Sequence, residues 1–276
     1  MTKKHNTSAI QRRLIPSYIF LIIVSFISVF PFYWMISAAT NTTVDVARGK
    51  LTIGMHAAEN FANLLANQDL WRTMGNSFFY AIVQTILCLF VCSLAGYGFE
   101  LYHDKGKDRL FAVLLLAMMV PQVATMIPLF RMISKMHLLN SVWAFILPSI
   151  STPFMIMMFR QNSRNFPVSI MEAARIDGLN EFKIFFSMYV PIMKSTYAAA
   201  TVVTFMNAWN SYMWPKVVMN DNRAQTMPML IANLASGYTT DYGMLMMGVL
   251  FCSVPTMIIF FVLQKSFAEG LTGAVK

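Results

Sequence analysis

Few residues of this 276-residue chain have the type and spacing to do chemistry. The four histidines are scattered without metal-ligand spacing, and the three cysteines lie inside apolar runs, so we expect neither a metal site nor a disulfide framework. The sequence contains no phosphate-binding Gly-x-x-x-x-Gly-Lys-Ser/Thr stretch. We therefore expect no catalytic residue and no cofactor bound by this chain, which leaves binding as its chemistry.

One group of residues has the types and spacing to bind a solute. Its members follow one face of a helix inside an apolar segment: Thr204, Asn207, Asn210, Ser211 and Trp214. Amides, hydroxyls and an indole that face a cavity would suit an uncharged, hydroxyl-rich solute, which makes these five candidate pore-lining residues. The same spacing fits hydrogen bonding between packed helices, and spacing alone leaves both interpretations open. Gln84, Gln122 and Thr125 share this ambiguity.

A second group forms the polar stretch Glu172-Ala-Ala-Arg-Ile-Asp-Gly-Leu179. Ser169 and Glu172 have capping-box spacing, which predicts a helix that begins near residue 170. Gly178 is the expected left-handed end of that helix, and Asn180 can cap a second one. Two short helices joined at a glycine would form a knob with an apolar face and charged edges. The knob could lie on the lipid interface or fill a groove on a partner protein, and Glu172 could simply cap its own helix.

The elements that position these groups are predicted to be membrane-spanning helices. The chain is 57% apolar and 12% charged, whereas soluble domains carry about 25% charged residues. Because the charges cluster between long uncharged runs, we expect an all-α membrane protein whose residues 1–276 form a single transmembrane domain. A bilayer crossing needs about 20 apolar residues. The six predicted spans are 15–36, 77–99, 110–130, 142–159, 195–214 and 242–263.

Basic residues predict the orientation of these spans. One side of the membrane receives 14 Lys and Arg and the other side 7, which places both termini and the central loop 160–194 in the cytoplasm. The loop 215–241 is then extracytoplasmic. Since the basic residues lie in short loops, where they set topology, the net charge of +9 does not indicate nucleic-acid binding.

The predicted spans have no Asp, Glu, Lys, Arg or His in their interiors. Intramembrane ionisable groups mark proton relays, so their absence counts against a proton-driven carrier, although sodium coupling through carbonyls and hydroxyls stays open. A membrane enzyme would lack a general acid, base or nucleophile. If ATP drives transport, another polypeptide must hydrolyse it. A self-contained secondary carrier or channel for a small polar solute remains the alternative.

Several segments carry a family resemblance that covers nearly the whole chain. Glu172-Ala173-Ala174, Asp177-Gly178 and the later Pro191 resemble the EAA motif of ATP-binding-cassette (ABC) importer permeases. Other segments resemble the maltose/oligosaccharide branch of that family: Ile127-Pro128-Leu129, Leu138-Leu139-Asn140, Ile146-Leu147-Pro148, Arg160-Gln161, Ala208-Trp209-Asn210, Trp214-Pro215 and the tail from Gly270 to Lys276.

The resemblance implies a type I ABC importer permease with six transmembrane helices, in the inner (cytoplasmic) membrane of a prokaryote. It implies four partners besides the lipid bilayer: a second, homologous permease that completes a heterodimer, an ATPase dimer that binds ATP and Mg, an extracytoplasmic solute-binding protein, and a di- or oligosaccharide. Loop 215–241 would enter the binding protein. The residues implied to couple to the ATPase are Glu172, Ala173, Ala174, Asp177, Gly178 and Leu179, and those of an ATPase-contacting tail are Gly270, Leu271, Thr272 and Gly273.

Overall fold

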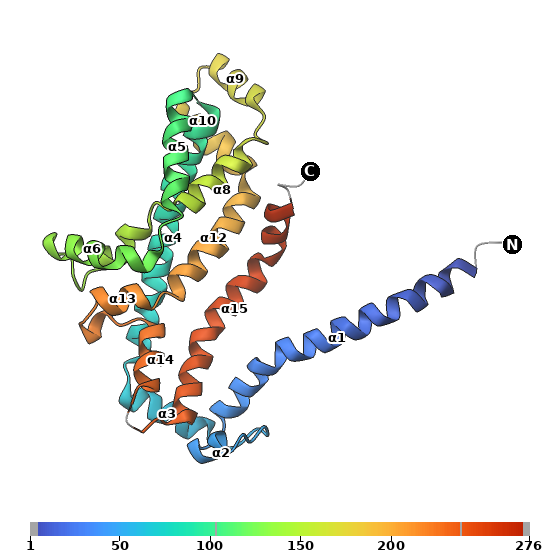
Figure 1. The fold of residues 1–276 in the computed structure, drawn as a ribbon, viewed down its shortest axis with the longest axis vertical. Coiled ribbons are helices and arrows are strands. Elements are labelled where there is room, and N and C mark those ends of the chain that lie inside the picture. Colours follow the sequence, from blue (N-terminus) through green and yellow to red (C-terminus); the bar gives the residue numbers. More distant parts are fainter. Residues whose placement is uncertain (1–4, 103, 238, 273–276) are drawn as a thin grey trace. The chain divides into compact units, whose positions relative to one another are not determined.

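The computed structural model describes residues 5–102, 104–237 and 239–272, and the regular elements within these ranges are all helical (Figure 1). The chain divides into two compact units. The first contains Met1–Gln68 and Asn233–Phe251, and the second contains Asp69–Ala232 and Cys252–Lys276. The prediction of an all-α protein is confirmed for the described residues.

The first unit contains α1 (His5–Ala39), α2 (Thr43–Ala47), α3 (Ala57–Asn67) and the beginning of α15 (Tyr242–Thr272). In α1, the side chains from Ile15 to Phe32 are exposed and almost all apolar. Ile15–Ala39 is long and apolar enough to cross a membrane. An apolar helix that its own unit does not cover is typical of a membrane span.

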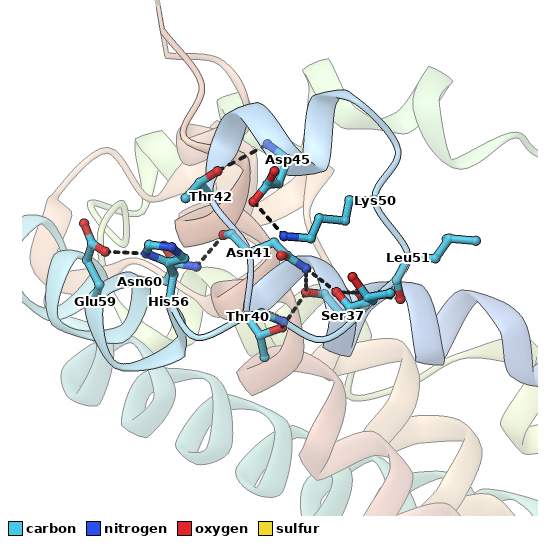
Figure 2. A network of polar contacts seen from close by, with 12 residues as sticks. Ser37, Thr40, Asn41, Thr42, Asp45, Lys50, Leu51, His56, Glu59 and Asn60 are labelled. Atoms are coloured by element: carbon cyan, nitrogen blue, oxygen red, sulfur yellow. Dashed lines mark hydrogen bonds and ion pairs between the residues drawn. The ribbon is translucent and has the colours of Figure 1, made fainter.

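Residues 37–60 form an ordered polar network rather than a loose loop (Figure 2). The fully buried Asn41 donates to the carbonyls of Ser37 and Thr52 at 2.9 and 2.7 Å. Asn60 donates to the carbonyls of Ala39 and Asn41, both at 2.9 Å. These bonds satisfy backbone groups that the turn after α1 leaves without helical partners. Asn60 belongs to α3, so the network ties the turn after α1 to that helix.

The second unit is built around α4 (Leu70–Leu101), which packs most extensively against two helices, α8 (Pro153–Ser163) and α12 (Lys194–Trp209). The cysteines of α4 contribute to a core with Met155, Phe159 and Ala200. The other elements of this unit are α5 (Lys105–Ala117), α6 (Gln122–Lys135), α7 (Val142–Ile146), η1 (Leu147–Ser149), α9 (Val168–Ile176), α10 (Glu181–Ile184), the π-helical turn η2 (Phe185–Tyr189), α11 (Val190–Ile192), α13 (Met213–Val218), η3 (Asn222–Ala224), most of α14 (Met227–Ala235) and the end of α15.

Among the described residues, three helices are long and apolar enough to span a membrane: Ile15–Ala39, Leu70–Leu101 and Tyr242–Val262. Two bent pairs raise the number to five if each is one span, α5 with α6 at 102° and Val142–Ser149 with α8 at 47°. The prediction for 110–130 differs from the structure because Pro121 lacks an N–H and disfavours a helical residue before it, so α5 ends at Ala117. Pro128, by contrast, lies inside α6.

The segment 215–241 is not the simple polar loop predicted from the sequence. It contains the end of α13, η3 and α14, and Met227 and Leu230 of α14 are fully buried. Asn140, with φ at 60°, accepts hydrogen bonds on its Oδ1 from the backbone N–H groups of Asn220 and Asp221. Asparagine tolerates this left-handed conformation better than most residues. The start of the segment is therefore held by the turn between α6 and α7.

The packing of α4 on α8 depends on the absence of a side chain at Gly96. A Cβ atom there would lie 2.6 Å from Cβ of Phe159 and 2.8 Å from the backbone nitrogen of Arg160. Small residues let membrane helices approach this closely. We predict that Gly96→Ala lowers stability by about 1–3 kcal/mol, because the two helices must move apart. The measurement is thermal unfolding of the purified protein in detergent.

Gly98→Ala is the matched control, since Gly98 lies on the same helix and a Cβ atom there would meet nothing within 4 Å. We expect this variant to melt at or slightly above the wild-type temperature, because alanine favours helix more than glycine does. Equal melting temperatures for the two variants would contradict the close approach of α4 and α8.

Candidate functional site

A cavity of about 790 Å³ lies within the second unit. Its volume falls in the range of small-molecule sites, about 300–1,000 Å³. The walls come from α4, α6, α8 and α12, together with residues around η1 and the start of α13. The polar residues that line it are Gln84, Gln122, Thr125, Ser149, Thr152, Thr204, Asn207, Asn210, Ser211, Tyr212 and Trp214.

The five candidate pore-lining residues all line this cavity. Gln84, Gln122 and Thr125, for which spacing also left both interpretations open, line it as well. The predicted helical face explains their grouping only in part. The helix α12 ends at Trp209, and Pro215, which has no N–H for the carbonyl of Ser211, favours a break before α13. Ser211 and Trp214 reach the same cavity through the break between α12 and α13.

The hydrogen bonds of these residues bear on the alternative of helix–helix packing. Trp214 donates its indole N–H to the carbonyl of Ala144 at 2.8 Å, so it does join two helices. Asn210 donates to the carbonyl of Met206 in its own helix. The Thr204 hydroxyl is buried without a hydrogen-bond partner. Trp214 therefore fits the alternative, and Thr204, whose side chain is 4% exposed, is likewise enclosed by the helix packing.

The cavity wall offers hydrogen bonds but no charge. No Asp, Glu, Lys, Arg or His is among the described residues that line it. A charged solute in such an environment would lack the countercharge that offsets its desolvation. Hydroxyl and amide groups interspersed with apolar surface can instead hold a neutral molecule that carries many hydroxyl groups.

The polar loop after α8 folds as two short helices joined at Gly178. Its φ of +78° confirms the predicted left-handed turn, and Asn180 caps α10 by accepting from the N–H of Lys183 at 2.9 Å. The predicted capping box is wrong. Because Pro167, with its fixed φ, stands at the N-cap, α9 begins at Val168 and Ser169 already lies inside the helix.

The six residues implied to couple to the ATPase divide between two faces of this loop. Glu172, Ala173, Asp177 and Gly178 are exposed. Ala174 is buried, and Leu179 is half-buried against the same apolar cluster. That cluster consists of Tyr97, Phe166, Met171, Ala174, Ile184, Phe185, Tyr189 and Met193. Ala174 and Leu179 therefore anchor the loop, while the other four residues lie on its outer face.

The outer face of the loop combines free carboxylates with large exposed apolar side chains. Ile176 is 86% exposed and Phe182 is 70% exposed. Neither Glu172 nor Asp177 has a side-chain hydrogen bond or ion pair with another described residue. Large exposed apolar side chains beside unpaired charges are typical of a surface that contacts a partner protein or the membrane.

A clamp consisting of Arg175, Glu181 and Tyr102 holds the two helices of the loop together. Arg175 donates to Oε1 of Glu181 at 2.8 Å and to the hydroxyl of Tyr102 at 2.9 Å, and that hydroxyl in turn donates to Glu181. The hydrogen bonds from Arg175 and then from Tyr102 lower the pKa of Glu181 below its ordinary value. Sequence reasoning missed the clamp, because more than 70 positions separate Tyr102 from its partners.

A second ionic cluster fixes α8 to the preceding helices. The Arg160 side chain, only 12% exposed, binds Glu100 at 3.1 Å and Asp108 at 2.7 Å. Its guanidinium also lies 4.2 Å from the centre of the Phe111 ring. Arg160 thereby joins α4, α5 and α8 beside the loop that carries α9 and α10.

Residues 94–273 match the family described as binding-protein-dependent transport system inner membrane component. The chain belongs to this family. It is 44% identical to the lactose transport system permease protein LacG of Rhizobium radiobacter, over 98% of this chain and 99% of that protein. It is 35% identical to the arabinooligosaccharides transport system permease protein AraQ of Halalkalibacterium halodurans, over 92% and 93% of the two chains.

A solved structure shows the same fold for this permease. It is the crystal structure of a bacterial ABC transporter involved in the import of the acidic polysaccharide alginate, matched with a TM-score of 0.83 over 93% of this chain and 97% of that one. Sequence identity is 18%, so the likeness concerns the fold alone. The fold expected from the resemblance is confirmed as that of an ABC importer permease.

The implied tail contacts of the permease fall at the end of the described chain. Gly270, Leu271 and Thr272 belong to the last turn of α15, and Gly273 lies outside the described residues. The role of the tail stays a prediction.

We predict that Glu181→Gln loosens the loop by weakening the clamp. Amide hydrogen exchange of residues 175–183 should rise up to about fivefold, the range for a partly exposed ion pair. Because the pKa of Glu181 is lowered, the clamp is complete at neutral pH and is lost as the pH falls through that lowered pKa.

Asp177→Asn is the control for this measurement, since it removes the same charge from the same loop at a residue outside the clamp. Its exchange should stay at the wild-type rate. A loop that exchanges equally fast in both variants would show that the clamp contributes nothing to its order.

Proposed function

We propose that this chain is one of two permease subunits of an ABC importer that carries a sugar, a di- or oligosaccharide, across the inner membrane of a prokaryote. One observation carries the proposal. The helices α9 and α10 form a knob whose outer face is exposed, whereas the sequence contains no phosphate-binding stretch with which this chain could hydrolyse ATP. The named relatives support the substrate class, because they are called lactose and arabinooligosaccharide permeases.

The proposed complex contains four further chains. A second, homologous permease completes the pore, two ATPase subunits bind ATP and Mg on the cytoplasmic side, and an extracytoplasmic solute-binding protein delivers the sugar. The family description, which names a binding-protein-dependent system, supports the last of these partners. In this arrangement the chain crosses the membrane six times, with α12 and the two bent helix pairs as complete crossings and both termini in the cytoplasm.

The loop around Gly178 is the proposed coupling element. The clamp and the buried cluster make it a rigid body, so a partner that grips its outer face can move α8 and α12 with it. Closure of the ATPase subunits around ATP would then switch the pore from inward-facing to outward-facing, as a rigid-body transition. Glu172, which has no partner in this chain, is available to a basic residue of the ATPase.

A substitution at Gly178 tests this coupling. We predict that Gly178→Pro abolishes the ATPase activity that the sugar-loaded binding protein stimulates in the reconstituted importer, because proline cannot adopt a φ of +78° and the two helices must reorient. Binding-protein docking should persist, since the change lies on the cytoplasmic side in the proposed topology.

Gly49→Pro provides a closely matched control. Gly49 has a φ of +76° and, like Gly178, no atom within 4 Å of a Cβ placed there, but it lies in the first unit between α2 and α3. Stimulated ATPase activity should survive in this variant. Normal stimulation in Gly178→Pro would contradict the assignment of the coupling loop.

A further inference from the structure

The residues after α2 turn back and run alongside the end of α1. We call residues 50–56 the return segment. The hydroxyl of Tyr33 on α1 donates to the carbonyl of Leu51 at 2.8 Å, and the backbone N–H of His56 donates to the carbonyl of Thr40 at 2.9 Å. The return segment therefore begins level with Tyr33 and rises to the turn that follows α1 (Figure 2).

The position of Tyr33 relates the return segment to the boundary of the membrane. A crossing of the hydrocarbon core takes roughly 20 residues, and in the span Ile15–Ala39 a count of that length from Ile15 ends at Trp34. Tyrosine and tryptophan are enriched at the membrane–water boundary. Because Leu51 is bonded to Tyr33, its backbone lies at this boundary, about 9 Å before the end of α1 at 1.5 Å per residue.

The return segment presents apolar side chains on its outer side. Leu51, Ile53 and Met55 are 45%, 66% and 98% exposed. Between them, Gly54 faces α1, because a Cβ atom there would lie 2.4 Å from the carbonyl oxygen of Thr40. The backbone of the segment thus belongs to the polar network, while three large apolar side chains lie outside it.

From these observations we infer that the return segment is an interfacial anchor, which inserts Leu51 and Ile53 into the phospholipid bilayer beside α1 and places Met55 among the headgroups. The exposed apolar surface of α1 reaches Tyr33, where the bonded segment continues it. Apolar side chains that enter the headgroup and upper acyl region bind a chain to the membrane surface. The anchor goes beyond the proposed function, since it concerns how the turn after α1 is held on the bilayer and not what crosses it.

The charges at the start of the return segment fit this location. Arg48 is exposed and forms no ion pair with another described residue. Lys50 pairs with Asp45 at 3.0 Å, and both side chains stay partly exposed. Gly49, with φ at +76°, turns the chain between the two basic residues. Basic side chains at such a boundary can reach lipid phosphates while their aliphatic parts stay in the apolar region.

The test measures the depth of a nitroxide label in the complete importer, reconstituted in nanodiscs of phosphatidylethanolamine and phosphatidylglycerol without the binding protein. The label is attached in turn to Leu51→Cys, Ile53→Cys and Met55→Cys. The native cysteines are buried, and the signal of the labelled wild-type importer is subtracted. Relaxation by oxygen, which dissolves in lipid, is compared with relaxation by a water-soluble nickel chelate. We expect the ratio of oxygen to nickel relaxation to fall from position 51 to position 55.

Two references calibrate this ratio. Phospholipids labelled at the headgroup and along the acyl chain give its values within the same bilayer. Ala58→Cys is the matched protein control, because Ala58 is exposed on α3, just beyond the bond between His56 and Thr40. The label there should give the low ratio of open water. The ratios at positions 51 and 53 should match those of lipids labelled between the headgroup and the upper acyl chain.

Two results would overturn the inference. A ratio at position 53 equal to that at position 58 would place the return segment in water, as a surface open to the binding protein. Exclusion of both relaxation agents from position 53 would show that another protein subunit covers it. Neither result bears on sugar import, which the ATPase measurement on Gly178→Pro tests separately.

Discussion

The interior of a bilayer excludes uncompensated charge, and the organisation of this chain follows from that constraint. Moving a charged side chain to the centre of a membrane costs several kcal/mol, so functional charges there are few and paired. The interiors of the predicted spans carry no such groups, and the charges lie near helix ends and in the connecting segments. Under the proposed function, the chain offers a solute hydrogen bonds within the membrane and receives energy from a partner ATPase. The cavity and the loop at Gly178 correspond to these two tasks.

The loop at Gly178 has a buried inner face and an exposed outer face, and its proposed role depends on this difference. Ala174 and Leu179 face the aromatic cluster around Tyr97 and Tyr189, and the clamp of Arg175, Glu181 and Tyr102 closes the open side. The outer face keeps Glu172 and Ile176 exposed. A loop whose inner face is firmly packed can transmit a displacement that a partner imposes on its outer face. A flexible loop would deform instead. The Arg160 ion pairs in turn join α8, the helix that precedes the loop, to α4 and α5.

Sequence patterns predicted those features that depend on local chemistry. Gly178 and Asn180 were identifiable because a left-handed turn and a helix cap each require a particular residue type. The capping-box pattern at Ser169 predicted the wrong start for this helix, because Pro167 at the N-cap makes α9 begin at Val168. The five candidate pore-lining residues line one cavity, but the helical periodicity behind their grouping ends at Trp209. Ser211 and Trp214 join the others through a break that depends on tertiary packing.

Features made by distant segments gave no sequence signal. The clamp at Tyr102 and the bonds from Asn140 to the backbone of 220–221 join positions more than 70 residues apart. The 102° bend between α5 and α6 falls inside the predicted span 110–130, and a proline permits such a break without setting its angle. The burial of α14 likewise depends on neighbours that a single segment does not reveal.

Solute flux into liposomes tests the central claim, that this chain forms half of a pathway driven by another polypeptide. Labelled sugar, the purified chain, the second permease, the ATPase subunits and the binding protein would be combined and then omitted one at a time. The account predicts ATP-dependent accumulation only with the full set and no flux with this chain alone. Sugar flux through the purified chain by itself would contradict the account and identify a self-contained carrier or channel.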